Sequence, residues 1–165
     1  MDDDVERLSS LFEKLGARNS NDWASSQILE GIPQLGRFLF LRQAWRYIVS
    51  NEDSSWIEAA IGEYKKDPNV PYGGVGWALG SLQAKGATSE ELTHLVRGMQ
   101  AELLFCLCYL LEDPGDLEAD VSDTSWGLFL LDENDQPVQP LAGLHASVLE
   151  MDPSGHEMRL AGTAE

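Results

Sequence analysis

The chain has 165 residues, with 28 Asp or Glu against 11 Lys or Arg, so its formal net charge is −17 at pH 7. Its length suits one domain with a buried core, and 43% hydrophobic residues are too many for a disordered protein. Two cysteines exclude a disulfide scaffold, no apolar run is long enough to span a membrane, and the negative charge disfavours direct binding to nucleic acid or anionic lipid.

Apolar residues at helical spacing predict six helices before residue 113. The helices are expected over residues 4–15, 20–31, 33–50, 54–67, 75–85 and 88–112. The segment Thr88-Ser-Glu-Glu91 is a capping box that starts the last of them. Its apolar run 103–111 is too short for a bilayer and predicts a helix end surrounded by protein. The apolar stripe expected on this helix comprises Leu92, Leu95, Val96, Met99, Leu103 and Leu107.

The pattern changes after residue 112. We expect an acidic loop over residues 113–124, a strand at 126–131, a turn, and a return strand at 137–140 that its prolines confine to a sheet edge. A short helix is expected at 144–150 and frayed structure at 160–165. The predicted fold is mainly α, a compact orthogonal bundle of about six helices with a small C-terminal β-hairpin. The single domain 1–165 divides into a helical bundle (1–112), the acidic loop (113–124), a hairpin with a short helix (125–159) and a frayed tail (160–165).

Most candidate chemical motifs have a structural interpretation. The glycine-rich segment 72–80 matches neither nucleotide-binding fingerprint, so its small residues indicate close helix packing. Cys106 and Cys108 lie about 200° apart on a helix and are interpreted as core residues. The set His145, Asp152 and His156 lacks metal-ligand spacing, so we predict neither a metal nor a cofactor.

Two arginines and a histidine leave a catalytic alternative open. Arg42 and Arg46 share one helix face and are expected to pair internally with Glu102 and Glu112. In the alternative, Glu102, His94 and one of these arginines form an acid–base pocket in a small enzyme. No nucleophile motif or cofactor fingerprint accompanies them, so no catalytic residue is assigned.

The charge distribution is the strongest functional signal. Between residues 98 and 158 the sequence has thirteen acids and no Lys or Arg. Acids around an exposed aromatic residue are typical of a surface that binds a basic protein. We therefore predict a non-enzymatic protein that neutralises or sequesters a basic partner, for example a nuclease toxin or a nucleic-acid-binding protein. The predicted partner-binding residues are Glu112, Asp113, Asp116, Glu118, Asp120, Asp123, Trp126, Asp132, Glu133 and Asp135.

Two further interpretations stay open. The negative charge alone keeps a protein soluble, without any specific partner. A homodimer through the apolar helix end or the hairpin edge is the third functional class, and it is compatible with binding of a basic partner. Because the sequence begins without a basic and apolar signal segment, we expect a cytoplasmic protein that does not contact a membrane.

Overall fold

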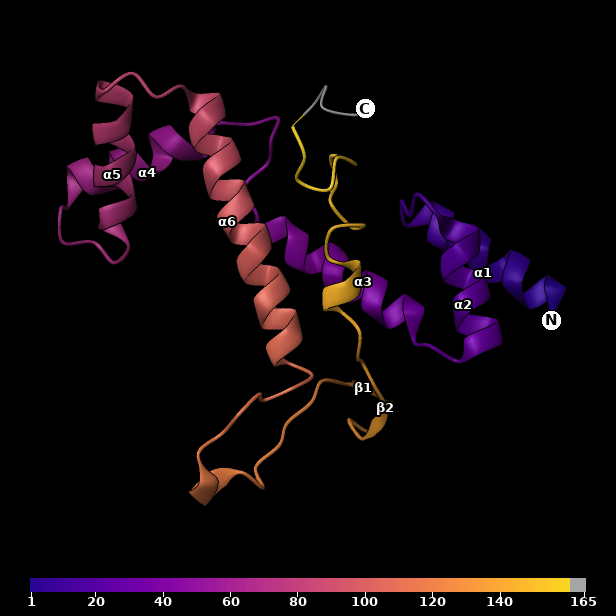
Figure 1. The fold of residues 1–165 in the computed structure, drawn as a ribbon. Coiled ribbons are helices and arrows are strands. Elements are labelled where there is room, and N and C mark those ends of the chain that lie inside the picture. Colours follow the sequence, from indigo (N-terminus) through magenta and orange to yellow (C-terminus); the bar gives the residue numbers. More distant parts are fainter. Residues whose placement is uncertain (161–165) are drawn as a thin grey trace. The chain divides into compact units, whose positions relative to one another are not determined.

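The computed structural model describes residues 1–160, in which six α-helices precede a two-stranded sheet (Figure 1). The helices are α1 (Asp2–Lys14), α2 (Ser20–Glu30), α3 (Gln34–Ala44), α4 (Ser55–Lys66), α5 (Gly73–Ala84) and α6 (Ser89–Leu110). The mainly α class with a small C-terminal hairpin, predicted from the sequence, is confirmed. None of these helices combines the length and apolar character that crossing a membrane requires, within the part of the chain that is described.

The remaining elements are short. Strands β1 (Phe129–Leu131) and β2 (Pro137–Pro140) pair antiparallel, with Leu130 opposite Gln139. Three 3-10 turns complete the order: η1 (Trp45–Tyr47), η2 (Ala119–Val121) and η3 (His145–Ser147). The third predicted helix therefore ends earlier than expected, and the helix predicted at 144–150 is a single turn. The predicted frayed end lies outside the described residues except for Leu160.

The chain forms two compact units, each with its own core. The first unit comprises residues 1–44 and 104–151, and the second comprises 45–103 with the segment from Asp152 onward. The single domain expected from the sequence stays a prediction. In the first unit, Phe12, Trp23 and Phe38 are buried and their rings contact one another, two of the three pairs edge to face. These aromatic contacts hold α1, α2 and α3 together.

The core of the second unit is aliphatic. Ile57 and Ile61 of α4 pack against Leu79 of α5 and Leu92 of α6. Gly76 lets α4 and α5 approach closely, because a Cβ atom at this position would lie 2.1 Å from the carbonyl oxygen of Ala60. The prediction that the glycine-rich segment serves helix packing is confirmed.

Helix α6 buries only part of the predicted apolar stripe: Leu92 is buried, but most of the other residues of the stripe are exposed. In the second unit, Thr93, Arg97 and Ala101 are buried, whereas Leu95, Met99 and Leu103 are 55–63% exposed. The cause is Arg97, whose guanidinium group lies over the Trp45 ring at 5.1 Å and pairs with Asp152. The expectation that the apolar helix end is surrounded by protein is also wrong, since the exposed residues there are Leu103, Phe105, Leu107, Tyr109 and Leu110.

Candidate functional site

The acidic loop lies in the first unit and connects α6 to β1 (Figure 1). Apart from η2 it has no regular structure, and a hydrogen bond closes its base. In that bond, Trp126 Nε1 donates to the carbonyl oxygen of Leu110 over 2.6 Å. An irregular surface segment with joined ends is an Ω-loop, a type of loop that frequently carries function.

The predicted partner-binding acids divide into free and engaged carboxylates. Asp113 and Asp132 are exposed, but each accepts hydrogen bonds from backbone N–H groups in its own turn. Glu112 is partly buried. No side-chain hydrogen bond or ion pair within residues 1–160 engages the exposed carboxylates of Asp116, Glu118, Asp120, Asp123, Glu133 and Asp135. Six carboxylates of this segment therefore have neither a hydrogen-bond donor nor a compensating cation within residues 1–160.

Apolar side chains are exposed within the same segment. Val121 and Trp126 are each 44% exposed, and Phe129, Leu131 and Val138 of the hairpin are also exposed. The indole N–H of Trp126 is already engaged by Leu110, so its ring is held in place while almost half of its surface faces solvent. Aromatic residues held in this way are favourable contact residues in protein interfaces.

Glu112 anchors the root of the acidic loop. Its Oε1 atom lies 3.0 Å from Nδ1 of His145, whose ring meets the Phe105 and Tyr109 rings edge to face. Burial acts to raise the pKa of Glu112, but hydrogen bonds from the Gly143 backbone and from His145 outweigh it, so the pKa is lowered. Glu112 therefore pairs with a histidine, and the expected pairing of Arg42 and Arg46 with Glu102 and Glu112 stays a prediction.

The two cysteines differ in their surroundings. Cys108 is fully buried, and burial followed by the charge of Glu112 raises the pKa of its thiol to about 11. Cys106 is exposed. The prediction of a core residue is confirmed for Cys108 and wrong for Cys106, because only the former lies on the side of α6 that is covered.

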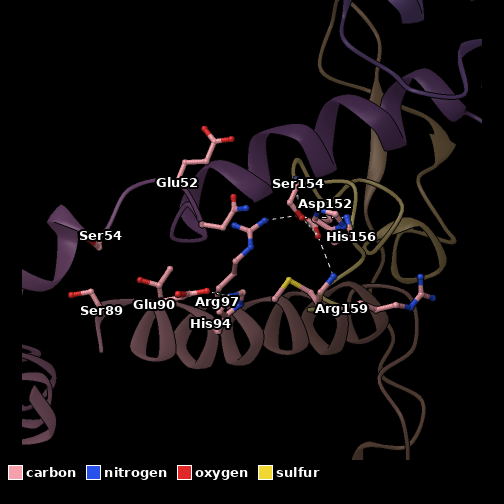
Figure 2. Close-up of a pocket in the computed structure, with 13 residues that line it drawn as sticks. Glu52, Ser54, Ser89, Glu90, His94, Arg97, Asp152, Ser154, His156 and Arg159 are labelled. Atoms are coloured by element: carbon pink, nitrogen blue, oxygen red, sulfur yellow. Dashed lines mark hydrogen bonds and ion pairs between the residues drawn. The ribbon is translucent and has the colours of Figure 1, made fainter. Parts of the chain in front are cut away.

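A second site lies in the second unit. It is a pocket of about 420 Å³ between α6, residues 51–54 and the segment from Asp152 onward. Figure 2 shows Glu90, His94 and Arg97 on α6 beside Asp152 and His156. His94 Nε2 lies 3.8 Å from Glu90 Oε1. The alternative catalytic set is not assembled, because Glu102 is exposed and does not line this pocket.

A buried ion pair holds this second site together. Arg97 Nη2 lies 2.5 Å from Asp152 Oδ1, and Nη1 donates to the carbonyl oxygen of Val49. Asp152 also accepts bonds from the Ser154 hydroxyl and from the backbone of Ser154 and Met158. Burial acts to raise the pKa of Asp152, but these hydrogen bonds outweigh it, so the pKa is lowered.

Neither this ion pair nor the His145–Glu112 pair was predicted from the sequence. Each joins residues far apart in the chain, so spacing did not connect them. A usable signal existed only for Asp152: the Asp-Pro-Ser-Gly sequence is typical of a turn in which the aspartate side chain bonds the backbone two residues on. The structure brings together no group of three or more acids, histidines or cysteines that could hold a metal, within the described residues.

Comparison with known proteins does not assign a function. We compared the chain with protein-family models, with curated proteins and with solved structures, and none of the three comparisons found a match. A function for this chain must therefore be inferred from its own residues and their chemistry.

Proposed function

We propose that this protein binds a basic protein partner through its acidic loop and thereby neutralises or sequesters it, in the manner of an immunity protein or a nucleic-acid mimic. The observation that carries the proposal is the set of uncompensated acids in one loop. Asp116, Glu118, Asp120 and Asp123 lie within eight residues and make no ion pair with the described part of the chain.

The physical support is electrostatic. Like charges held in a short segment repel one another, and a cationic partner relieves that repulsion while it gains attraction from each carboxylate. Long-range attraction of this kind raises association rates by about 10- to 1000-fold at low salt. Burial of the exposed Trp126 ring and of Val121 would then supply short-range affinity.

The test uses two variants with the same change in charge. The loop variant carries Asp116→Asn, Glu118→Gln, Asp120→Asn and Asp123→Asn. The control variant carries Asp2→Asn, Asp3→Asn, Glu6→Gln and Glu13→Gln on α1, where the four carboxylates are exposed and form no ion pair within residues 1–160. Both variants lose four negative charges, so any difference between them reports the position of the charge.

Basic proteins from the source lysate are captured on the wild-type chain at low salt, identified by mass spectrometry and purified. We expect a captured partner to bind the loop variant about tenfold or more weakly than the control variant at low salt. We also expect its affinity for the wild-type chain to fall steeply as NaCl is raised. Equal affinity for the two variants would overturn the proposal, as would partners whose binding is insensitive to salt.

A further inference from the structure

The last turns of α6 expose an apolar face within the first unit. Leu107 is 47% exposed and Leu110 is 46% exposed, and because the two residues lie one turn apart they share a face of the helix. Leu110 follows the fully buried Cys108 by two positions, which places it about 160° round the helix from that residue. The two leucines therefore lie on a side of α6 that faces solvent.

The indole ring of Trp126 extends this apolar face beyond the helix. Its Nε1 atom donates to the carbonyl oxygen of Leu110, so the ring lies at the last turn of α6 while 44% of the residue is exposed. Apolar residues exposed singly are normal, but adjacent leucines beside a fixed tryptophan ring are typical of an interaction surface. We call Leu107, Leu110 and Trp126 the helix-end patch.

The helix-end patch borders the acidic loop, which leaves the helix just after Leu110 and returns to the patch at Trp126. The acids of this loop that form no ion pair within residues 1–160 include Asp116, Glu118, Asp120 and Asp123. A second copy of this chain would bring the same acids toward their counterparts, and an anionic membrane would repel them as well. An occupant with Lys or Arg beside an apolar face complements both the patch and the loop.

The backbone of α6 has no free groups to offer this occupant. Even at the end of the helix, the carbonyl oxygens of Leu107 and Leu110 accept bonds from the Leu111 N–H and from the Trp126 indole. An extended strand on this patch would therefore leave its own N–H and C=O groups without backbone partners, whereas an α-helix satisfies these groups internally. An amphipathic helix is the element that such a surface binds most readily.

We propose that the helix-end patch binds the apolar face of a basic amphipathic helix, whose Lys and Arg side chains contact the carboxylates of the acidic loop. This inference rests on the proposed function. It narrows the basic partner to a protein that presents a helix with a leucine-like stripe between basic residues.

The experiment compares two synthetic peptides of about 18 residues, a length of about five helical turns. The amphipathic peptide has leucines at i, i+3, i+4 and i+7 spacing and lysines at most other positions. The scrambled peptide has the same composition and charge, but its leucines do not share a helix face. Binding to the 165-residue chain is measured by calorimetry, circular dichroism and backbone NMR at low salt in a reducing buffer.

We expect the amphipathic peptide to bind at least about tenfold more tightly than the scrambled one, because only the former buries its leucines on the patch. It should gain helical circular dichroism on binding and shift the amide resonances of Leu107 and Leu110 and the indole N–H resonance of Trp126. Equal affinity of the two peptides, or binding without a gain in helix, overturns the inference. This comparison uses the wild-type chain and needs no substitution.

A double substitution then tests the patch itself. Leu107→Gln with Leu110→Gln should weaken binding of the amphipathic peptide about tenfold, to the level of the scrambled peptide, and leave the scrambled peptide unaffected. The matched control is Leu29→Gln with Leu82→Gln, which changes exposed leucines on α2 and α5 and should bind both peptides as the wild type does. A preference for the amphipathic peptide that survives the patch substitution overturns the inference.

Failure of this inference and failure of the proposed function give different results. If the loop variant weakens binding of both peptides but the wild type does not distinguish them, the acidic loop binds basic partners and the helical occupant is wrong. If the loop variant and the α1 control variant bind both peptides equally, the proposed function fails, and this inference fails with it. Dimerisation of the wild type that the patch substitution abolishes would assign the patch to a second copy and overturn the inference.

Discussion

Asp152 is a buried acid whose carboxylate is paired within the protein. Its carboxylate is 1% exposed and accepts hydrogen bonds from Arg97, Ser154 and Met158. The sequence placed it among the thirteen acids of a segment without Lys or Arg, where it looks like one more surface charge. Its partner Arg97 is the last basic residue before that segment, 55 positions earlier in the chain. A count of charges along the chain cannot detect pairing over this separation.

We predict that Asp152→Asn lowers the free energy of unfolding by about 3–5 kcal/mol, because it leaves the buried Arg97 charge unpaired. Glu157→Gln is the matched control, since Glu157 pairs with the exposed Arg159 and such a pair is worth about 1 kcal/mol or less. Urea unfolding of both variants measures the difference. If Arg97→Met combined with Asp152→Asn were no more stable than Asp152→Asn alone, the unpaired arginine would not be the cause.

The same carboxylate makes stability depend on pH. The pKa of Asp152 is lower in the folded chain than its ordinary value of about 3.9, so the folded state favours the ionised form. This contribution is fully present above the ordinary value and is lost as the pH falls through the lowered pKa. The wild-type advantage over Asp152→Asn should accordingly be constant from neutral pH to about pH 5 and shrink below about pH 4. A constant advantage down to pH 2 would contradict this assignment.

The helices were predictable because their signals are local. The capping box forms as expected: Glu91 N–H donates to Thr88 Oγ1, and the Thr88 backbone and hydroxyl donate to Glu91 Oε2. The orientation of α6 was not predictable, since the buried side is decided by the contacts of Arg97 with Trp45 and Asp152. The apolar pattern of the sequence alone favours burial of the leucines of α6. Among the site residues, the acidic loop could be located from composition, whereas the pocket depends on segments that are distant in sequence.

The contact between α4 and α5 is where a single methyl group should matter most. Gly76→Ala would place a Cβ atom 2.1 Å from the backbone oxygen of Ala60 and 2.8 Å from Cβ of Tyr64, so one helix must move. We predict a loss of about 1–3 kcal/mol in the free energy of unfolding. Gly74→Ala in the same helix meets open space and should leave stability unchanged or raise it by up to about 1 kcal/mol. Denaturant unfolding measures both, and equal effects would contradict the close approach of the helices.

The net charge of −17 should also act on the stability of the chain as a whole. Carboxylates without counter-charges repel one another, and folding brings them closer than they are in the unfolded chain. The acidic loop is a concentrated example, because its four central acids have no basic neighbour in sequence, whereas α1 has Arg7 and Lys14 among its acids. Screening by salt and removal of loop charge should both reduce this repulsion.

We therefore predict that the thermal midpoint of the wild-type chain rises as the ionic strength increases from 0.01 to 0.15 M, over which the Debye length falls from about 30 Å to about 8 Å. The loop variant with Asp116, Glu118, Asp120 and Asp123 neutralised should have a higher midpoint at low salt and a smaller salt response. The control variant on α1 should gain less, because its acids also stabilise the helix N-terminus. Calorimetric scans at matched pH measure all three chains. If neutralising the loop acids lowered the midpoint at low salt, their charges would be compensated within the molecule, and the electrostatic reason for a cationic partner would fail even before a partner is known.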